Sequence, residues 1–333
     1  MPQSLVLNLI AQSAISQKYL QGRAPQQLFF DLVDEVDPEL GNILRQDEQS
    51  RAYSLSALQI DLRGSQAKAT RPEAVGTATA KALPMSARVA RRNVRLLTTR
   101  TDLPLQFSHR QAIESGTRCW WRITFLDDEL FDHLIFLWNQ LLSEPFQLGG
   151  GTVAITNVTA DMPNLRPSVA PWPGMNWASS CSYRDLYETA SAYEQDIHIQ
   201  FITPTAFEEE GCVSPMPTAG AVFHPLRKCW NRYSGLAFAP SLVKNIVPMT
   251  FNIRTEAIHA SSVTKTVSET LSGCVGQVSF RILGDDPLTT KRLNALADFS
   301  CYCGIGYGTP VGLGTVRRLS GSSAKIVPSR IHL

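Results

Sequence analysis

Five glycines and two arginines are concentrated between Cys303 and Arg318, where the sequence reads CGIGYGTPVGLGTVRR. Glycine leaves the backbone bare, so backbone amides can approach another group closely. Clustered amides and guanidinium groups are typical partners of phosphate oxygens. One interpretation is a loop that lies against a nucleic-acid backbone, and the other is a loop that needs glycine only for its turns. The first interpretation predicts nucleic-acid contacts from Gly304, Gly306, Gly308, Gly312, Gly314, Arg317 and Arg318.

Two other phosphate-binding loops do not fit this stretch. The dinucleotide pattern GxGxxG fails, because its sixth position holds Thr309 or Val311, depending on the glycine from which it is counted. The stretch also precedes an expected strand, whereas the dinucleotide loop opens a helix. A P-loop needs glycine followed by Lys and then Ser or Thr, a sequence absent here. We therefore expect no nucleotide cofactor at this loop.

Basic residues also gather in two other places. An expected helix at 221–235 carries Arg227, Lys228 and Arg232, which either contact nucleic acid or form a solvated helix face. Residues 62–100 hold nine Lys and Arg residues and a single acidic residue, Glu73. This segment is either a basic arm that touches phosphates or a solvated loop inserted between two strands.

The composition limits the function classes. The chain has 333 residues, of which 44% are hydrophobic, and its formal net charge is +2. This length predicts two domains, and the small net charge means that any nucleic-acid surface must be local. Seven scattered cysteines include no CxxC pair, so we expect no metal site and a reducing compartment. No apolar run is long enough to span a bilayer, which favours a cytoplasmic protein without a membrane partner.

Hydrophobic periodicity predicts the order strand, helix, strand, strand, helix, strand twice along the chain. In the first half, alternating leucines at 5–9 indicate a strand, and Leu28 begins a helical stripe that Pro38 stops or restarts. The other elements of this half are expected at 52–58, 119–126, 128–142 and 151–158. In the second half, strands are expected at 197–207, 247–253, 273–283 and 312–319, with helices at 221–235 and 287–303.

This element order is that of the ferredoxin-like unit. We therefore predict an α+β protein with two tandem ferredoxin-like (βαββαβ, RRM-like) domains. The expected boundaries are an N-terminal domain at 1–157 with the basic insertion at 62–100, a loop-rich connection at 158–194, a C-terminal domain at 195–319 and a tail at 320–333.

The glycine stretch resembles the C-terminal signature of the CRISPR-associated repeat-RNA endoribonucleases, the sixth Cas family of the RAMP superfamily. That signature is Gly-hydrophobic-Gly, five residues and a second Gly-hydrophobic-Gly, and here it reads GIG, YGTPV and GLG. The five residues lack the Lys or Arg that the family usually carries there. Segments along most of the chain resemble the family in the same order, including QLFFDLVDEVDPELGNILRQ, WWRITFLDDELF, FITPTAF and AVFHPLRKCWNRY.

The resemblance implies binding of CRISPR repeat RNA and its cleavage without a metal or cofactor. A ribose 2′-hydroxyl would attack the adjacent phosphate and leave a 2′,3′-cyclic phosphate at the end of the upstream product. The alternative is a non-cleaving subunit that holds repeat RNA inside a CRISPR effector complex. Other Cas subunits of such a complex are therefore an open expectation as partners.

The sequence departs from the family at its catalytic histidine. Arg45 stands where family members often carry that residue, after DPxLxxxL, and no histidine precedes His109. Arginine is a poor base at neutral pH but can stabilise a pentavalent phosphorane. We therefore take Arg45 and Arg23 as catalytic candidates, with Tyr19 as an orienting residue, against the alternative that all three are ordinary surface residues.

Overall fold

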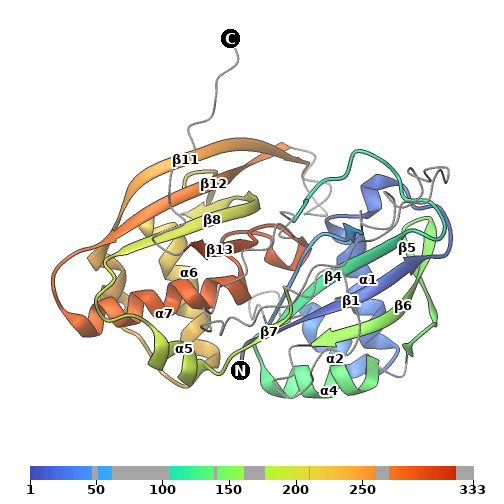
Figure 1. The fold of residues 1–333 in the computed structure, drawn as a ribbon, viewed down its shortest axis with the longest axis horizontal. Coiled ribbons are helices and arrows are strands. Elements are labelled where there is room, and N and C mark those ends of the chain that lie inside the picture. The colour runs from blue at the N-terminus through green and yellow to red at the C-terminus, as the bar shows by residue number, and fades with distance from the viewer. Residues whose placement is uncertain are drawn as a thin grey trace, which may run out of the picture.

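The computed structural model describes residues 1–46, 52–61, 105–138, 141–160, 177–209, 211–259 and 270–319. The expectations for the basic insertion, for the four prolines of the connection and for the tail lie outside these residues. The described residues form two halves that stand side by side, each with a large antiparallel sheet and its own helices (Figure 1). No described helix is long and apolar enough to cross a membrane.

The N-terminal half contains a ferredoxin-like sheet with the strand order β2-β4-β1-β6, extended at one edge by β5. All neighbouring strands in this order are antiparallel. Its elements are β1 (Gln3–Ala11), the 3-10 turn η1 (Gln17–Tyr19), α1 (Arg23–Asp34), α2 (Pro38–Gln46), β2 (Tyr53–Leu55), β3 (Gln59–Ile60), β4 (Arg118–Phe125), α4 (Asp128–Trp138), β5 (Pro145–Leu148) and β6 (Gly151–Ala160).

The C-terminal half repeats this topology with the strand order β11-β12-β8-β13, again fully antiparallel. The predicted pair of ferredoxin-like folds is therefore confirmed. The elements of this half are β8 (Asp196–Thr205), β9 (Phe207–Glu209), β10 (Cys212–Ser214), α6 (Ala219–Tyr233), the 3-10 turn η4 (Pro240–Asn245), β11 (Ile246–His259), β12 (Thr270–Ile282), α7 (Pro287–Cys303), the 3-10 turn η6 (Thr309–Val311) and β13 (Val316–Leu319).

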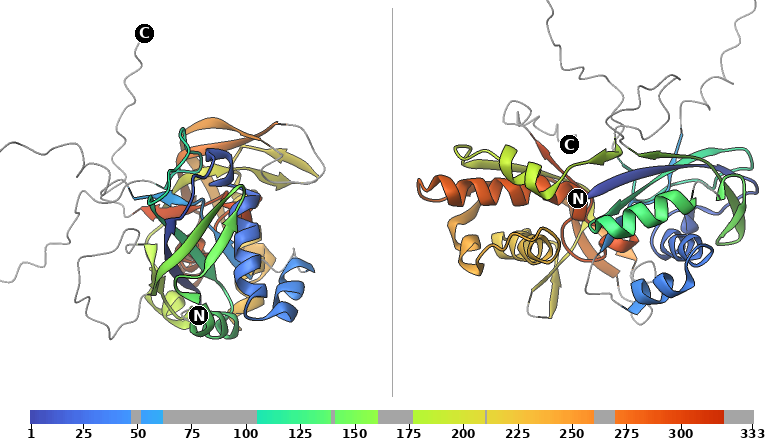
Figure 2. Two further views of the ribbon diagram at one scale, coloured as in Figure 1. Left: turned by 90° about the vertical axis from the view of Figure 1, so that its right-hand side faces the viewer. Right: turned by 90° about the horizontal axis from the view of Figure 1, so that it is seen from below.

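Strand alternation decides what each sheet face buries. In β1, Leu5, Leu7 and Leu9 face α1 and α4 and lie in the N-terminal core, whereas Val6 packs on the opposite face with Trp120. Figure 2 shows α1 and α2 together on one side of this sheet. The C-terminal core is built in the same way, from one face of β8 and β12 and the apolar faces of α6 and α7.

The connection between the halves contains more regular structure than the loop-rich expectation allowed. Strand β7 (Ser179–Ser180) pairs with β1 of the N-terminal sheet. Helix α5 (Tyr183–Thr189) then begins at Ser182, whose hydroxyl accepts a hydrogen bond from the Asp185 amide and caps the helix. Tyr183 and Leu186 enter the C-terminal core. The connection thus belongs structurally to both halves.

Candidate nucleic-acid interface

The glycine-rich loop follows α7 and lies at the seam between the two halves (Figure 1). Its five glycines all have positive φ, between 67° and 93°. Gly312 also approaches the N-terminal half closely, because a Cβ there would lie 2.9 Å from the backbone nitrogen of Ala57. Only glycine satisfies both conditions without strain. Turn geometry and domain contact therefore account for glycine at this position.

Most amides of this loop are hydrogen-bonded within the protein. Ile305 N and Gly314 O bond across the base of the loop at 2.9 Å, and Tyr307 N donates to Ala206 O at 2.7 Å. Five other loop amides also donate to carbonyl oxygens of the protein, namely those of Gly304, Val311, Gly312, Leu313 and Gly314. Only the other amides of the loop can therefore make the expected contacts with phosphate.

The loop is anchored on the N-terminal half by apolar contacts. Val311 and Leu313 are buried in a small cluster against which Phe107 packs. The turn η6 lies against β2 and α1. Leu58 N donates to Leu20 O at 2.8 Å, which ties the segment after β2 to the residues just before α1. The seam therefore gathers the glycine loop, the segment at 56–58 and the start of α1.

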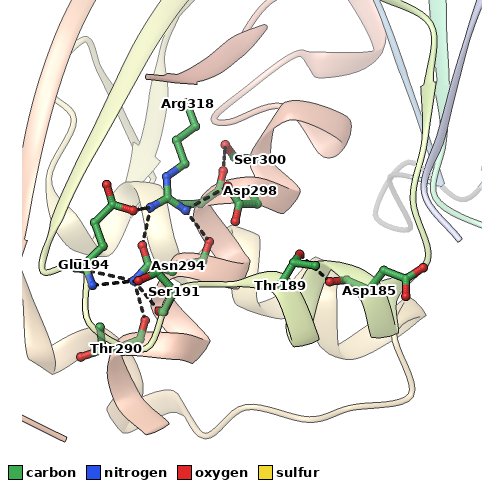
Figure 3. Close-up of polar contacts among 10 residues, drawn as sticks. Asp185, Thr189, Ser191, Glu194, Thr290, Asn294, Asp298, Ser300 and Arg318 are labelled. Carbon is green, nitrogen blue, oxygen red and sulfur yellow. Dashed lines mark hydrogen bonds and ion pairs between the residues drawn. The ribbon is translucent and has the colours of Figure 1, made fainter. Parts of the chain in front are cut away.

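Arg318 lies inside the C-terminal half and is largely consumed by intramolecular bonds. Its side chain is 13% exposed, and its guanidinium pairs with Glu194 at 2.8 Å and with Asp298 at 2.9 Å. It also bonds the Asn294 side chain, as Figure 3 shows. Burial raises the pKa of Asp298, and Arg318 opposes that rise by favouring the carboxylate. A guanidinium that already carries these partners has little capacity left for RNA phosphate.

Arg317 points to the other face of β13, as strand alternation requires. Its guanidinium lies 4.8 Å from the ring centroid of Trp177, and the guanidinium of Arg122 lies 5.8 Å from the same centroid. Arg122 is almost fully buried and donates to Ser4 Oγ, to Cys301 O at 2.7 Å and to Trp177 O at 3.1 Å. The helix-free faces of the two sheets therefore meet at Trp177, with two guanidinium groups beside it.

The N-terminal candidates separate into two places. Arg23 is the first residue of α1, directly after Gly22, and its buried Nε has no hydrogen-bond partner among the described residues. Tyr19 lies in η1 at the same end of α1, with its ring against Gly149 and Lys18 Nζ 4.8 Å from the ring centroid. Arg23 thus begins α1 at the seam, and Tyr19 precedes Leu20, whose carbonyl accepts the bond from Leu58 N.

Arg45 is not brought to this point. Its guanidinium forms an ion pair with Asp34 and lies 4.6 Å from the ring centroid of Phe30. The Asp34 hydrogen bond raises the pKa of Arg45, which stays charged. Asp34 ends α1 and lies eleven positions after Arg23, which corresponds to roughly 16 Å along a helix axis. The structure therefore places the two catalytic arginine candidates at opposite ends of α1.

The basic residues of α6 are divided between packing and solvent. Arg227 donates to Phe238 O at 3.0 Å and so braces the loop that follows α6. Lys228 and Arg232 are exposed on the same helix. Among the described residues, no three His, Cys, Asp or Glu side chains are grouped as metal ligands.

His109 is the residue at the seam that sequence patterns did not single out. Its Nε2 lies 2.6 Å from Leu58 O, in the same segment that contacts Gly312. Burial lowers the pKa of His109, and the hydrogen bond to Leu58 partly opposes this. No local pattern could have revealed this histidine, because its sequence neighbour is the basic insertion and its spatial neighbours come from residues about 50 positions earlier.

Family models match nearly the whole chain. The CRISPR Cas6 N-terminal domain model matches residues 1–188, and the CRISPR-associated endoribonuclease Cas6 model matches residues 199–316. The second match contains the whole glycine loop, and the first contains α1 and His109. A comparison with curated protein sequences finds no match.

Solved structures with the same fold span the full chain. A Cas6 (TTHB231) product complex has a TM-score of 0.65 and 19% identity, covering 96% of this chain and 100% of that one. A Cas6 (TTHA0078) product complex has a TM-score of 0.61 and 18% identity, covering 96% and 99%. Thermus thermophilus Cas6 (TTHB231) has a TM-score of 0.58 and 18% identity, covering 96% and 98%. At these identities the likeness concerns the fold.

Proposed function

The chain belongs to the CRISPR-associated Cas6 endoribonuclease family, and from this membership we infer that it binds CRISPR repeat RNA and cuts it into guide RNA. The family matches over both halves are the observation that carries this proposal. The glycine loop at the seam supports it, because RNA laid across the seam would meet groups from both halves. The two similar Cas6 structures described as product complexes are consistent with it.

The proposed chemistry is metal-independent transesterification. The ribose 2′-oxygen attacks the adjacent phosphorus, the bond from phosphorus to the 5′-oxygen breaks, and the upstream product ends in a 2′,3′-cyclic phosphate. Cations must stabilise the phosphorane charge, and a positioned base must accept the 2′-hydroxyl proton. We assign the first role to Arg23, with Tyr19 as the orienting residue, because both lie at the seam; Arg45 stays the weaker candidate.

RNA contact is proposed for the glycine loop through the amides that the protein leaves unbonded, and for Arg317 beside Trp177. Lys228 and Arg232 on α6 are proposed as outlying phosphate contacts, since both are exposed cations. Arg227 and Arg318 are weaker candidates because both donate to partners inside the protein.

A non-cleaving repeat-RNA-binding subunit is the second candidate. The observation that favours it is the absence of any histidine from the first 108 residues, where family members often carry one. Such a subunit would keep the fold and the RNA-binding surface but would not cleave RNA. In that case the other Cas subunits of an effector complex would be its partners.

One experiment separates the two candidates. The purified full chain is incubated with cognate repeat RNA in EDTA, and products are resolved alongside an alkaline-hydrolysis ladder. Cleavage at one phosphodiester, with a cyclic phosphate on the upstream fragment, is expected. Tight binding with intact RNA would instead support the non-cleaving subunit, and neither binding nor cleavage would contradict both candidates.

A further inference from the structure

We propose that His109 is the catalytic proton acceptor of the cleavage reaction, in place of the histidine that family members often carry at the position of Arg45. This inference rests on the proposed function and adds a residue to it. It is carried by the position of His109 at the seam, by the way its ring is held and by the nitrogen that this arrangement leaves available.

The segment that carries His109 is held on both sides. The Gln59 side chain makes two hydrogen bonds of 2.8 Å to the backbone of Gln106. Its Oε1 accepts from the Gln106 amide, and its Nε2 donates to the Gln106 carbonyl. Phe107 packs against the small apolar cluster that includes Val311 and Leu313 of the glycine loop. His109, two residues further, is held to the segment after β2 by its bond to Leu58 O.

The ring of His109 has a defined tautomer. A carbonyl oxygen can only accept a hydrogen bond, so the 2.6 Å contact with Leu58 O requires Nε2 to carry the proton. The neutral imidazole then presents a lone pair at Nδ1, and no second hydrogen bond to His109 occurs within the described part of the chain. An imidazole oriented through one nitrogen and open at the other is the arrangement used by general bases.

The electrostatic setting favours the base form. Burial lowers the pKa of His109, so the ring is neutral near pH 7 and able to accept a proton. Leu58, whose carbonyl holds the ring, is adjacent to Ala57, which contacts Gly312. RNA that lies on the glycine loop would therefore pass close to the imidazole.

The reaction step balances without a further reagent. The 2′-hydroxyl proton moves to Nδ1 of His109 as the bond between the 2′-oxygen and phosphorus forms. The bond between phosphorus and the 5′-oxygen breaks, and the leaving oxygen takes a proton from water. The imidazolium then returns its proton to the hydroxide, which restores the neutral ring.

Other histidines with described side chains have different surroundings. His133 on α4 pairs with Asp37 at 3.0 Å, and His198 Nδ1 is bonded to Ser279 Oγ at 2.7 Å across β8 and β12. His224 is exposed on α6. Within the described part of the chain, none of these three has a hydrogen bond to the glycine loop or to the residues that begin α1. His109 is instead bonded to the segment that Gly312 approaches.

The test is the single-turnover cleavage rate of His109→Gln under saturating enzyme, beside repeat-RNA affinity and thermal stability. Glutamine can still donate to Leu58 O but cannot exchange a proton. We expect a rate loss of roughly a hundredfold or more with unchanged affinity and melting temperature. In His109→Ala, added imidazole should restore part of the rate. His133→Gln serves as the matched control, with the parent rate expected.

The possible failures are distinguishable. If the parent cuts and His109→Gln cuts equally fast, His109 is only a structural residue and the inference is overturned while the proposed function stands. If His109→Gln loses affinity and rate in proportion, its role is in binding, which also overturns the inference. A parent that binds repeat RNA without cutting it overturns this inference together with the cleavage proposal.

Discussion

At the scale of single residues, the two N-terminal arginines should behave differently. Arg23 begins α1 at the seam, whereas Arg45 is bound to Asp34 at the far end of that helix. We expect Arg23→Ala to lower the single-turnover cleavage rate by roughly tenfold to a thousandfold with a smaller effect on affinity, because a phosphorane contact forms mainly in the transition state. Arg45→Ala should instead lower stability. Equal rate losses would contradict this separation.

Gly312 offers a second test at this scale. Gly312→Ala places a Cβ 2.9 Å from the backbone nitrogen of Ala57, at a φ of 93° that alanine rarely adopts. We expect a loss of at least about 1 kcal/mol in the free energy of unfolding, measured in urea. Gly150→Ala is the control, because no atom lies within 4 Å of its added Cβ. Parent-like stability for Gly312→Ala would show that the seam is looser than described.

At the scale of elements, Asp37 caps helix α2 by accepting a hydrogen bond from Leu40 N at 3.0 Å. That bond, helped by His133, lowers the pKa of Asp37. Because the folded pKa is below the unfolded one, the stabilisation is complete above about pH 4 and disappears as pH falls through the folded value. Asp37→Ala should cost about 1 kcal/mol at pH 7.

The same variant has a pH signature. The difference in unfolding free energy between the parent and Asp37→Ala should shrink as the pH falls below about 4, where the parent loses its own carboxylate. Urea titrations at neutral and acidic pH measure this difference. Glu144→Ala removes an exposed carboxylate that caps no helix and should show no such change. A pH-independent difference would mean that Asp37 acts through packing.

At the scale of the whole molecule, Arg122 connects the halves. It donates from β4 to Ser4 in β1, to the Cys301 carbonyl in α7 and to the Trp177 carbonyl, while burial lowers the pKa of Arg122 to about 10. Removing the guanidinium removes a buried charge, which stabilises the fold, but leaves a cavity and unpaired acceptors, which destabilise it. We expect the destabilising effect to be larger. Arg122→Ala should cost about 1–3 kcal/mol in unfolding free energy.

A matched control for this prediction is Arg184→Ala, which removes an exposed ion pair with Glu188 within helix α5. Its unfolding free energy should stay close to that of the parent, because solvent screens an exposed ion pair. Limited proteolysis of the two variants adds a readout of domain contact. A stability for Arg122→Ala equal to that of Arg184→Ala would show that Arg122 adds no net stability to the contact between the halves.

The sequence by itself determined the element order, the two ferredoxin-like halves and the resemblance to the Cas6 family. These features depend on patterns that are local in the chain, such as the alternating leucines of β1, the break in the helical stripe at Pro38 and the glycine spacing after α7. Periodicity and backbone preferences act over a few residues and are readable without coordinates. The strand β7 and the helix α5 escaped prediction because they are short, with two and seven residues, and follow a proline-rich segment.

Only the tertiary structure decided which side chains share the seam. Arg317 and Arg318 are adjacent in sequence, yet the strand pleat sends one to Trp177 and the other to Glu194 and Asp298. The sequence likewise could not show that Arg45 is bound to Asp34, or that His109 bonds to Leu58, next to the residue that Gly312 approaches. These contacts join residues far apart along the chain, and their geometry depends on how the two halves pack together.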